Sequence, residues 1–328
     1  MSSHAEEDFA AKVAKTVKDS QDAARKALAI DDDPHNHEEL QDSRGKNGIL
    51  VEGSAEGTYF LPNHQSEQDR LNLQHQIFLL SFNDKLVLAP IAEDEIKHVL
   101  DIGTGSGIWP VEFAEQHPNT QVLGFDISPC APPSIPLNCK FEVHDAEAEW
   151  HFPQKFDYIH GRALMSCFHY PLAVIKSAFA ALEPGGYLEL QDCVAPWHSL
   201  DDTLSGTTLW RFHQMTIAAA ASLGRDVTQV VKYKAFFEEA GFVDVKEVHY
   251  QWPLGKWAKG EKMKKVGEMF QEDVESLMDV LAERLLVRGA GIEKEKADEM
   301  VEAVRRDCRD WKVHAYMPGI VVHGRKPE

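Results

Sequence analysis

Val99-Leu100-Asp101-Ile102-Gly103-Thr104-Gly105-Ser106-Gly107 is a short apolar run with one acidic residue, followed by three glycines at every second position. Apolar Val99, Leu100 and Ile102 suit a strand that is buried in a parallel sheet. The glycines allow a tight turn in which the backbone can lie against a ligand without interference from side chains. The stretch therefore predicts a buried strand, a glycine-rich turn and a cofactor site of the nucleotide type.

The spacing of the glycines indicates which cofactor this turn would hold. Dinucleotide-binding turns follow Gly-x-Gly-x-x-Gly, where the third glycine lets the helix approach the strand and the pyrophosphate lies at the helix N-terminus. Here Ile108 stands at the third position. Asp101 would repel a pyrophosphate but suits a ligand that carries an ammonium and a sulfonium group. We therefore expect S-adenosylmethionine rather than NAD, and a turn without any ligand is the alternative.

Acidic residues also follow the next two predicted strands. Residues 121–126 end in Asp126, where an adenosine-binding α/β domain uses a carboxylate to accept hydrogen bonds from both ribose hydroxyls. Residues 140–144 lead into Asp145, whose carboxylate is suitably placed to accept a hydrogen bond from the adenine amino group. The remaining predicted strands are residues 156–160, 185–190, 243–252 and 313–324.

Together these motifs resemble those of the class I S-adenosylmethionine-dependent methyltransferases, and more narrowly those of the fungal LaeA-like methyltransferases of secondary metabolism. The narrower resemblance depends on Leu-Pro-Asn at 61–63 combined with His-Gly-Arg at 160–162, and it covers residues 57–327. It implies an α/β fold with a doubly wound, Rossmann-like sheet of seven mostly parallel strands, the last of them antiparallel.

The resemblance and the strand ends together select the candidate cofactor residues. Tyr59 and His75 belong to a segment that, by resemblance, folds over the cofactor, and Arg162 could pair with its methionine carboxylate. The alternatives are packing at the sheet edge for Tyr59 and His75, and a structural ion pair for Arg162. The candidates are Tyr59, His75, Asp101, Gly103, Thr104, Gly105, Gly107, Asp126, Ile127, Asp145, Ala146, Gly161 and Arg162.

Two insertions should form a substrate chamber, because ligands of doubly wound sheets bind beyond the carboxyl ends of the strands. Residues 193–233 and 254–311 leave such ends, and their aromatic and methionine side chains suit a small apolar or aromatic acceptor. These side chains could instead form the core of the cap. We expect residues 49–328 to form the methyltransferase domain. Residues 1–48 should be a helical and flexible extension that could pack on a second copy, on a partner protein or over the site.

Methyl transfer to an oxygen, nitrogen or sulfur atom needs alignment and exclusion of water rather than a covalent nucleophile. A base of near-neutral pKa can still be required. His169, His198 and His213 are the candidates, each with a structural role as the alternative. No metal is expected in the site, because the fourth strand ends in His-Gly-Arg and offers no carboxylate there to a divalent cation.

The composition bounds the partners and the compartment. The chain has 34 Lys and Arg against 53 Asp and Glu, a net charge of −19, which discourages binding to nucleic acid or anionic membranes. Five cysteines without paired spacing, and the absence of a signal or a long apolar run, predict a cytoplasmic or nuclear protein. Two alternatives stay open: a regulatory cofactor-binding protein that acts through a protein partner, and an enzyme that uses the sulfonium charge in a non-methylating rearrangement.

Overall fold

One sheet of eight strands organises the chain, of which the computed structural model describes residues 3–33, 65–130 and 132–328. The strands are β1 (His98–Ile102), β2 (Gln121–Asp126), β3 (Cys139–Val143), β4 (Phe156–Arg162), β5 (Leu182–Cys193), β6 (His198–Ser199), β7 (Val243–Pro253) and β8 (Ala315–Arg325). Their order is β3-β2-β1-β4-β5-β8-β6, and β7 also pairs with β8. Neighbours among β1 to β5 pair in parallel, whereas β8 is antiparallel to β5, β6 and β7.

This sheet confirms the expected α/β class with an antiparallel last strand, but it has eight strands rather than seven. The additional strand, β6, contains only His198 and Ser199, which pair with Tyr316 and Ala315 of β8. Two residues carry no periodicity, so their pairing depends on the position of β8 and not on a local pattern.

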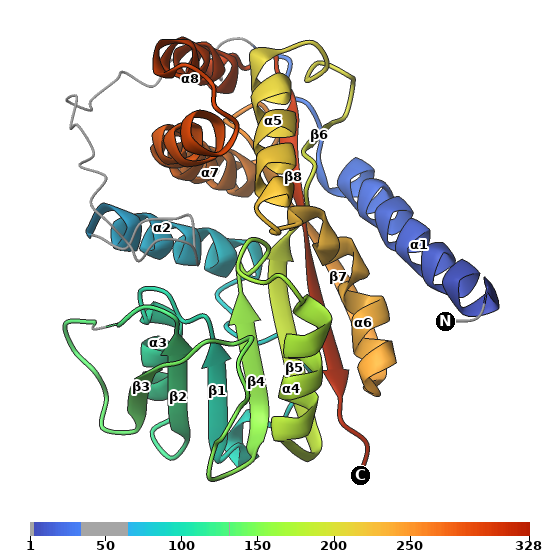
Figure 1. Cartoon of the computed structure of the whole chain (residues 1–328), viewed down its shortest axis with the longest axis vertical. Helices are drawn as coiled ribbons and strands as arrows, with labels where there is room; N and C mark the ends of the chain where they lie inside the picture. Colours follow the sequence, from blue (N-terminus) through green and yellow to red (C-terminus); the bar gives the residue numbers. More distant parts are fainter. Residues whose placement is uncertain (1–2, 34–64, 131) are drawn as a thin grey trace.

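Helices cover both faces of the sheet (Figure 1). α3 (Ile108–Gln116) packs Trp109 and Phe113 against Val99 and Val122 on one face. The other face carries α4 (Pro171–Ala181) and α6 (Tyr233–Ala240), in a core that includes Leu100. Adjacent Val99 and Leu100 thus enter opposite cores, as successive residues of a strand must.

The remaining helices lie beyond the carboxyl ends of β1, β2 and β4, where Figure 1 shows α2 crossing above the strands and the others stacked further out. All of them except the 3-10 helix that follows α5 contribute to one core, in which Phe78 of α2 packs edge-on against Trp252 of β7 with ring centroids 4.8 Å apart. The elements are α2 (Gln65–Ser81), α5 (Thr208–Ser222), the 3-10 helix η3 (Val227–Lys232), α7 (Glu261–Leu281), the π-helix η4 (Ala282–Gly289) and α8 (Lys294–Arg309). We call this group the cap; a short 3-10 helix, η2 (Glu93–Glu95), precedes β1.

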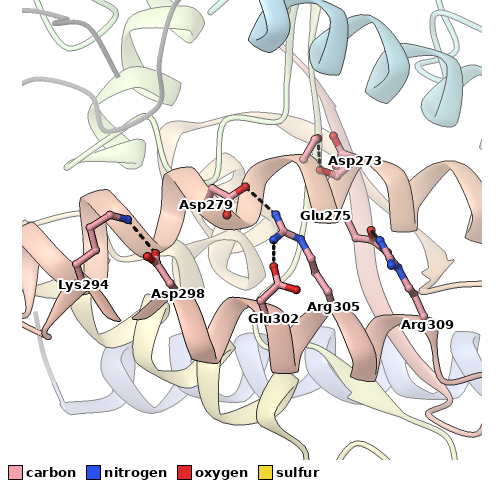
Figure 2. Close-up of polar contacts among 9 residues, drawn as sticks. Asp273, Glu275, Asp279, Lys294, Asp298, Glu302, Arg305 and Arg309 are labelled. Atoms are coloured by element: carbon pink, nitrogen blue, oxygen red, sulfur yellow. Dashed lines mark hydrogen bonds and ion pairs between the residues drawn. The ribbon is translucent and has the colours of Figure 1, made fainter. Parts of the chain in front are cut away.

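Ion pairs join α7 to α8 inside the cap (Figure 2). Arg305 of α8 donates to Asp279 of α7 at 2.7 Å, and Arg309 donates to Glu275 through two nitrogens at 3.1 and 2.7 Å. Together with the apolar contacts of Val301 and Val304, these pairs hold the two outer helices of the cap side by side.

The N-terminal helix α1 (Ser3–Ala27) packs on its own chain. Phe9 lies 5.9 Å from the ring of Phe236 in α6, and Ala24 and Leu28 pack on Trp257. The expected extension is therefore helical and docked along β7 in its first part, and the rest of it, from residue 34, lies outside the described residues. None of the helices described is both long and apolar enough to cross a membrane. The five cysteines all lie within the described ranges and form no disulfide.

Candidate active site

The glycine-rich turn between β1 and α3 forms the floor of the site. Gly103, Gly105 and Gly107 have φ angles of 62°, 56° and 80°, in the left-handed region that glycine favours. A Cβ atom on Gly103 would lie 2.6 Å from Leu164, and one on Gly107 would lie 2.7 Å from the Cys130 sulfur. Both the backbone conformation and the close packing therefore require glycine here.

Asp126, at the end of β2, is held against this turn by backbone hydrogen bonds. Its Oδ2 accepts from the Gly105 nitrogen at 2.9 Å, and its Oδ1 accepts from the Ser128 nitrogen at 3.0 Å. Burial raises the pKa of Asp126, and the bonds from Ser128 and Gly105 oppose that shift. Since each carboxylate oxygen has a further lone pair, Asp126 can still accept from two hydroxyl groups of a ligand.

Asp101 lies beside the turn and is paired inside the protein. It accepts a hydrogen bond of 2.7 Å from Nδ1 of His160, whose ring stacks on Trp109 with centroids 3.8 Å apart. The residue is buried, and it also lines a small cavity of 50 Å³ beside Thr104. Its negative charge is thus placed to face a cation in that cavity.

Arg162, at the end of β4, is fixed from behind by His75. Nη2 of Arg162 donates to Nδ1 of His75 at 2.7 Å, and Nε2 of His75 donates to Glu112 at 2.6 Å. Burial lowers the pKa of His75, so it is neutral and can accept from Arg162. The guanidinium also lies 4.8 Å from the ring centroid of Phe78. Arg162 has five N–H donors, and those that His75 does not engage can bind an anionic group.

A cavity of 220 Å³ opens at the ends of β1, β2 and β4, and the small cavity beside Asp101 adjoins it through Gly103, Gly105 and Arg162. Both are lined by candidate cofactor residues. Those around the two cavities are Asp101, Gly103, Thr104, Gly105, Asp126, Ile127, Asp145, Ala146 and Arg162.

Four candidate cofactor residues lie elsewhere. Gly107 packs on Phe141 and Cys130, and Gly161 packs on Leu164. His75 is fully buried behind Arg162 and does not border either cavity. Tyr59 lies outside the described residues. The two glycines and His75 therefore support the wall of the site rather than form its surface.

A third cavity, of 190 Å³, lies under the cap, and we call it the chamber. Leu71 of α2 and Ala163 line both the chamber and the 220 Å³ cavity at the strand ends, which we call the strand-end cavity. The chamber and the strand-end cavity therefore meet at these two residues. The chamber wall is mainly apolar and comes from β5, α5, β7, α7 and η4. Its large side chains include Trp197, Leu209, Phe212, Trp252, Phe270, Leu281 and Leu285.

Only His213 of the three candidate bases reaches the chamber. Its Nε2 accepts from the Trp197 nitrogen at 3.1 Å, and its ring stacks on Trp197 with centroids 4.8 Å apart. Burial, with His198 nearby, lowers the pKa of His213 to about 3. His169 is bound to Glu147 at 3.0 Å in the strand-end cavity, and His198 lies in β6 against Tyr316. His213 is thus neutral with its basic nitrogen occupied, and the geometry offers no histidine base to the chamber from these three.

Asp192, at the end of β5, lines the chamber instead. Its Oδ2 accepts from the Leu164 nitrogen and the Tyr233 hydroxyl, both at 3.0 Å, and its Oδ1 accepts from the Cys193 nitrogen at 2.9 Å. Burial raises the pKa of Asp192 to about 7, against the effect of these hydrogen bonds. The carboxyl group can therefore gain or lose a proton near neutral pH.

Asp192 and the ion pairs of Arg70 were not predicted from the sequence. Asp192 falls two residues beyond 185–190, the stretch from which the fifth strand was predicted, although its place at the end of β5 resembles that of Asp126 at the end of β2. Arg70 pairs with Glu67 three residues earlier and with Asp273 in α7. The Glu67 spacing is visible in the sequence, whereas the pairing with Asp273 follows only from the docking of α2 on α7.

The sequence of the chain is similar to those of known methyltransferases. Residues 73–247 match a family described as a methyltransferase domain. Over 280 residues the chain is 34% identical to the probable methyltransferase tdiE of Emericella nidulans, covering 84% of this chain and 88% of that one. It is 28% identical to the protein-methionine methyltransferase laeA of the same fungus, covering 89% and 79%. A solved phosphoethanolamine N-methyltransferase 2 from Haemonchus contortus, in complex with S-adenosylhomocysteine, aligns with a TM-score of 0.44 at 15% identity, covering 79% of this chain and 52% of that one.

Proposed function

Because the chain belongs to the methyltransferase domain family and uses S-adenosylmethionine as methyl donor, we propose that it methylates a small apolar or aromatic molecule in the chamber. The observation that carries this proposal is the meeting of the two cavities at Leu71 and Ala163. An acceptor in the chamber can there face a donor that lies along the strand ends.

The residues of the strand-end cavity and of the small cavity beside Asp101 fit the methyl donor. The sulfonium and ammonium groups suit the negative charge of Asp101, the ribose hydroxyls suit the free lone pairs of Asp126, and the methionine carboxylate suits the donors of Arg162. Asp145 lines the same cavity, with Oδ1 accepting from the Glu147 nitrogen at 2.9 Å, and its carboxylate suits the adenine amino group. When bound, the donor supplies a methyl group on positively charged sulfur.

The chamber supports an apolar or aromatic acceptor. Its wall offers aromatic faces and branched aliphatic side chains, with few polar groups to set orientation, among them Gln74, Ser166 and Thr216. We expect the cap to keep water from the bound reactants, and fixed alignment of two reactants can contribute roughly 7–11 kcal/mol to lowering a barrier. The work of the protein is therefore mainly to align the acceptor and to keep the site dry.

Asp192 is the group we assign to proton removal. Its carboxyl group borders the chamber next to the segment that includes Ala163, and its pKa of about 7 suits a general base at neutral pH. A base is useful when the attacking atom bears a proton, so this assignment favours an O–H or N–H acceptor. His213, whose Nε2 is engaged by the backbone of Trp197, can serve only as a hydrogen-bond donor through Nδ1.

The proposal is tested with S-adenosylmethionine that carries a deuterated methyl group, incubated with the full chain and fractionated extract of the producing cell. Mass spectrometry should find a small molecule that has gained one labelled methyl group. An isomer of unchanged mass would instead indicate a rearrangement. Label found only on protein, or no conversion in any fraction by a chain that binds S-adenosylhomocysteine, would replace the proposal with the regulatory alternative.

A further inference from the structure

A polar cluster whose residues line none of the cavities described above lies where α1 packs on β7. Glu247 and His249 are two residues apart on β7, so their side chains project from the same face of the strand. Asp19 approaches them from α1. One ligand atom from each of these three residues lies within 4.8 Å of the other two, and small side-chain rotations would bring all three around a single ion.

Among the described residues, no lysine or arginine balances the charges of this cluster. The Glu247 side chain is only 4% exposed, and its oxygens accept from the Thr16 hydroxyl at 3.0 Å and meet Nε2 of His249 at 3.1 Å. No lysine or arginine in the described ranges forms an ion pair with Glu247 or Asp19. A buried carboxylate beside a second carboxylate is costly unless a cation accompanies it.

An unsatisfied nitrogen atom of His249 also indicates that a cation is bound here. Nδ1 of His249 is buried and has no hydrogen-bond partner among the described residues, although the side chain as a whole is 11% exposed. Such atoms are uncommon in folded proteins, and an unseen ion or water is one of the usual reasons for them.

We infer that Asp19, Glu247 and His249 bind a divalent transition-metal ion of the Zn²⁺ type. One imidazole and two carboxylates form a ligand set that suits Zn²⁺ better than Mg²⁺ or Ca²⁺, which prefer oxygen ligands alone. The ion neutralises both carboxylates. Asp19 is half-buried, so the ion can enter from its side and keep water in the remaining coordination positions.

This ion has a structural role, because its ligands come from two elements that are remote in sequence. Asp19 belongs to α1, whereas Glu247 and His249 belong to the strand next to β8 in the sheet. Binding of the ion therefore ties the N-terminal helix to the sheet, and the free energy of binding adds to the docking of that helix. The site is separate from methyl transfer, so its test does not depend on the acceptor.

The test measures Zn²⁺ bound to the full chain after removal of metal with a chelator, by equilibrium dialysis and elemental mass spectrometry. We expect one tightly bound Zn²⁺ per chain. Asp19→Asn, Glu247→Gln and His249→Gln should each weaken binding by at least about 10-fold. Asp22→Asn, on the same helix, and His151→Gln, an exposed histidine, are the matched controls and should retain the wild-type affinity.

Two further measurements protect this test from a folding defect. Circular dichroism and binding of S-adenosylhomocysteine show whether each variant is folded, and Zn²⁺ should slow proteolysis within residues 3–33 of the wild type but not of His249→Gln. The inference is overturned if folded wild-type chain binds no stoichiometric Zn²⁺. It is equally overturned if the control variants lose as much affinity as the ligand variants, since binding would then be scattered over the acidic surface.

Discussion

At the scale of single residues, burial gives two titratable groups of the chamber opposite roles. It raises the pKa of Asp192 to about 7 and lowers the pKa of His213 to about 3, in each case toward the uncharged form. Near neutral pH Asp192 therefore exchanges a proton, whereas His213 does not. The residue type alone would suggest the reverse assignment.

Removal of the Asp192 carboxylate should impair catalysis rather than donor binding. Asp192→Asn is expected to lower kcat about 100-fold or more, which is the usual contribution of a general base. The limb of the kcat/KM profile that rises with pH near pH 7 should disappear. Calorimetry should show unchanged affinity for S-adenosylhomocysteine, because Asp192 lines the chamber and not the strand-end cavity.

The Tyr233→Phe variant distinguishes a base from a merely structural acid. The hydroxyl donates to Oδ2 of Asp192 at 3.0 Å, and its loss should raise the pKa of Asp192 further, since the carboxylate loses a donor. The rising limb should then move to higher pH while the maximal rate is retained. A limb that stays in place would show that Asp192 does not carry the proton.

Burial of neutral His213 should make stability depend on pH. Below its ordinary pKa of 6.5 the unfolded chain protonates this residue, whereas the folded chain does so only near pH 3. The free energy of unfolding should therefore fall by about 1.4 kcal/mol for each pH unit below about 6 on account of this residue. Urea unfolding at pH 7, 6 and 5 should show a shallower fall for His213→Gln, and no such change for exposed His151→Gln.

At the scale of elements, buried charges fasten α2 to α7 within the cap. Arg70 donates to Glu67 through Nε at 2.9 Å and Nη2 at 2.6 Å, and to Asp273 of α7 through Nη1 at 2.7 Å. All three residues are buried. Because Leu71 follows directly and lines both cavities, this contact between α2 and α7 also fixes the place where the cavities meet.

Removing Arg70 alone should lower the free energy of unfolding strongly, whereas replacing all three charged residues by apolar ones should not. Arg70→Ala leaves two buried carboxylates without a partner and is expected to lower the free energy of unfolding by about 3–5 kcal/mol. The triple variant Glu67→Leu, Arg70→Met, Asp273→Leu should recover most of this loss in urea unfolding. Arg305→Ala removes the more exposed pairs with Asp279 and Glu302 in Figure 2 and should cost less than about 1 kcal/mol.

At the scale of the whole molecule, the proposed function places the methyl donor at the strand ends and the acceptor under the cap. The ends of β1, β2 and β4 provide the polar strand-end cavity, and the cap provides the apolar chamber. A change confined to α5 or α7, which do not line the strand-end cavity, should therefore affect acceptor methylation without affecting donor binding.

Filling the chamber from α5 tests this separation. Ile217 lines the chamber on that helix, and Ile217→Trp should reduce methyl transfer at least about 10-fold by occupying acceptor space, with the affinity for S-adenosylhomocysteine unchanged. Ala218→Trp places the same side chain on the exposed side of the helix and should leave both unchanged. Equal loss of donor binding in Ile217→Trp would contradict the separation.

Most of the strand-end cavity could be predicted from sequence because its signals are local. Apolar runs mark the strands, alternate glycines mark a turn with positive φ, and an acid such as Asp126 ends its strand. The parallel topology then brings these ends to one edge of the sheet. His75 was expected at the surface of the site, but it lies behind Arg162. Its position depends on the packing of α2, which the local sequence does not show.

By itself the sequence determined the fold class, the family resemblance and the group of residues at the strand ends. The tertiary structure alone decided the position of the chamber, the burial of Asp192 on which its proposed role as a base rests, and the meeting of Asp19 with Glu247 and His249. The physical reason is that a pKa, a cavity and a ligand cluster depend on burial and distance between segments far apart in the chain. No local periodicity encodes those distances, whereas strands and turns are encoded by residues next to one another.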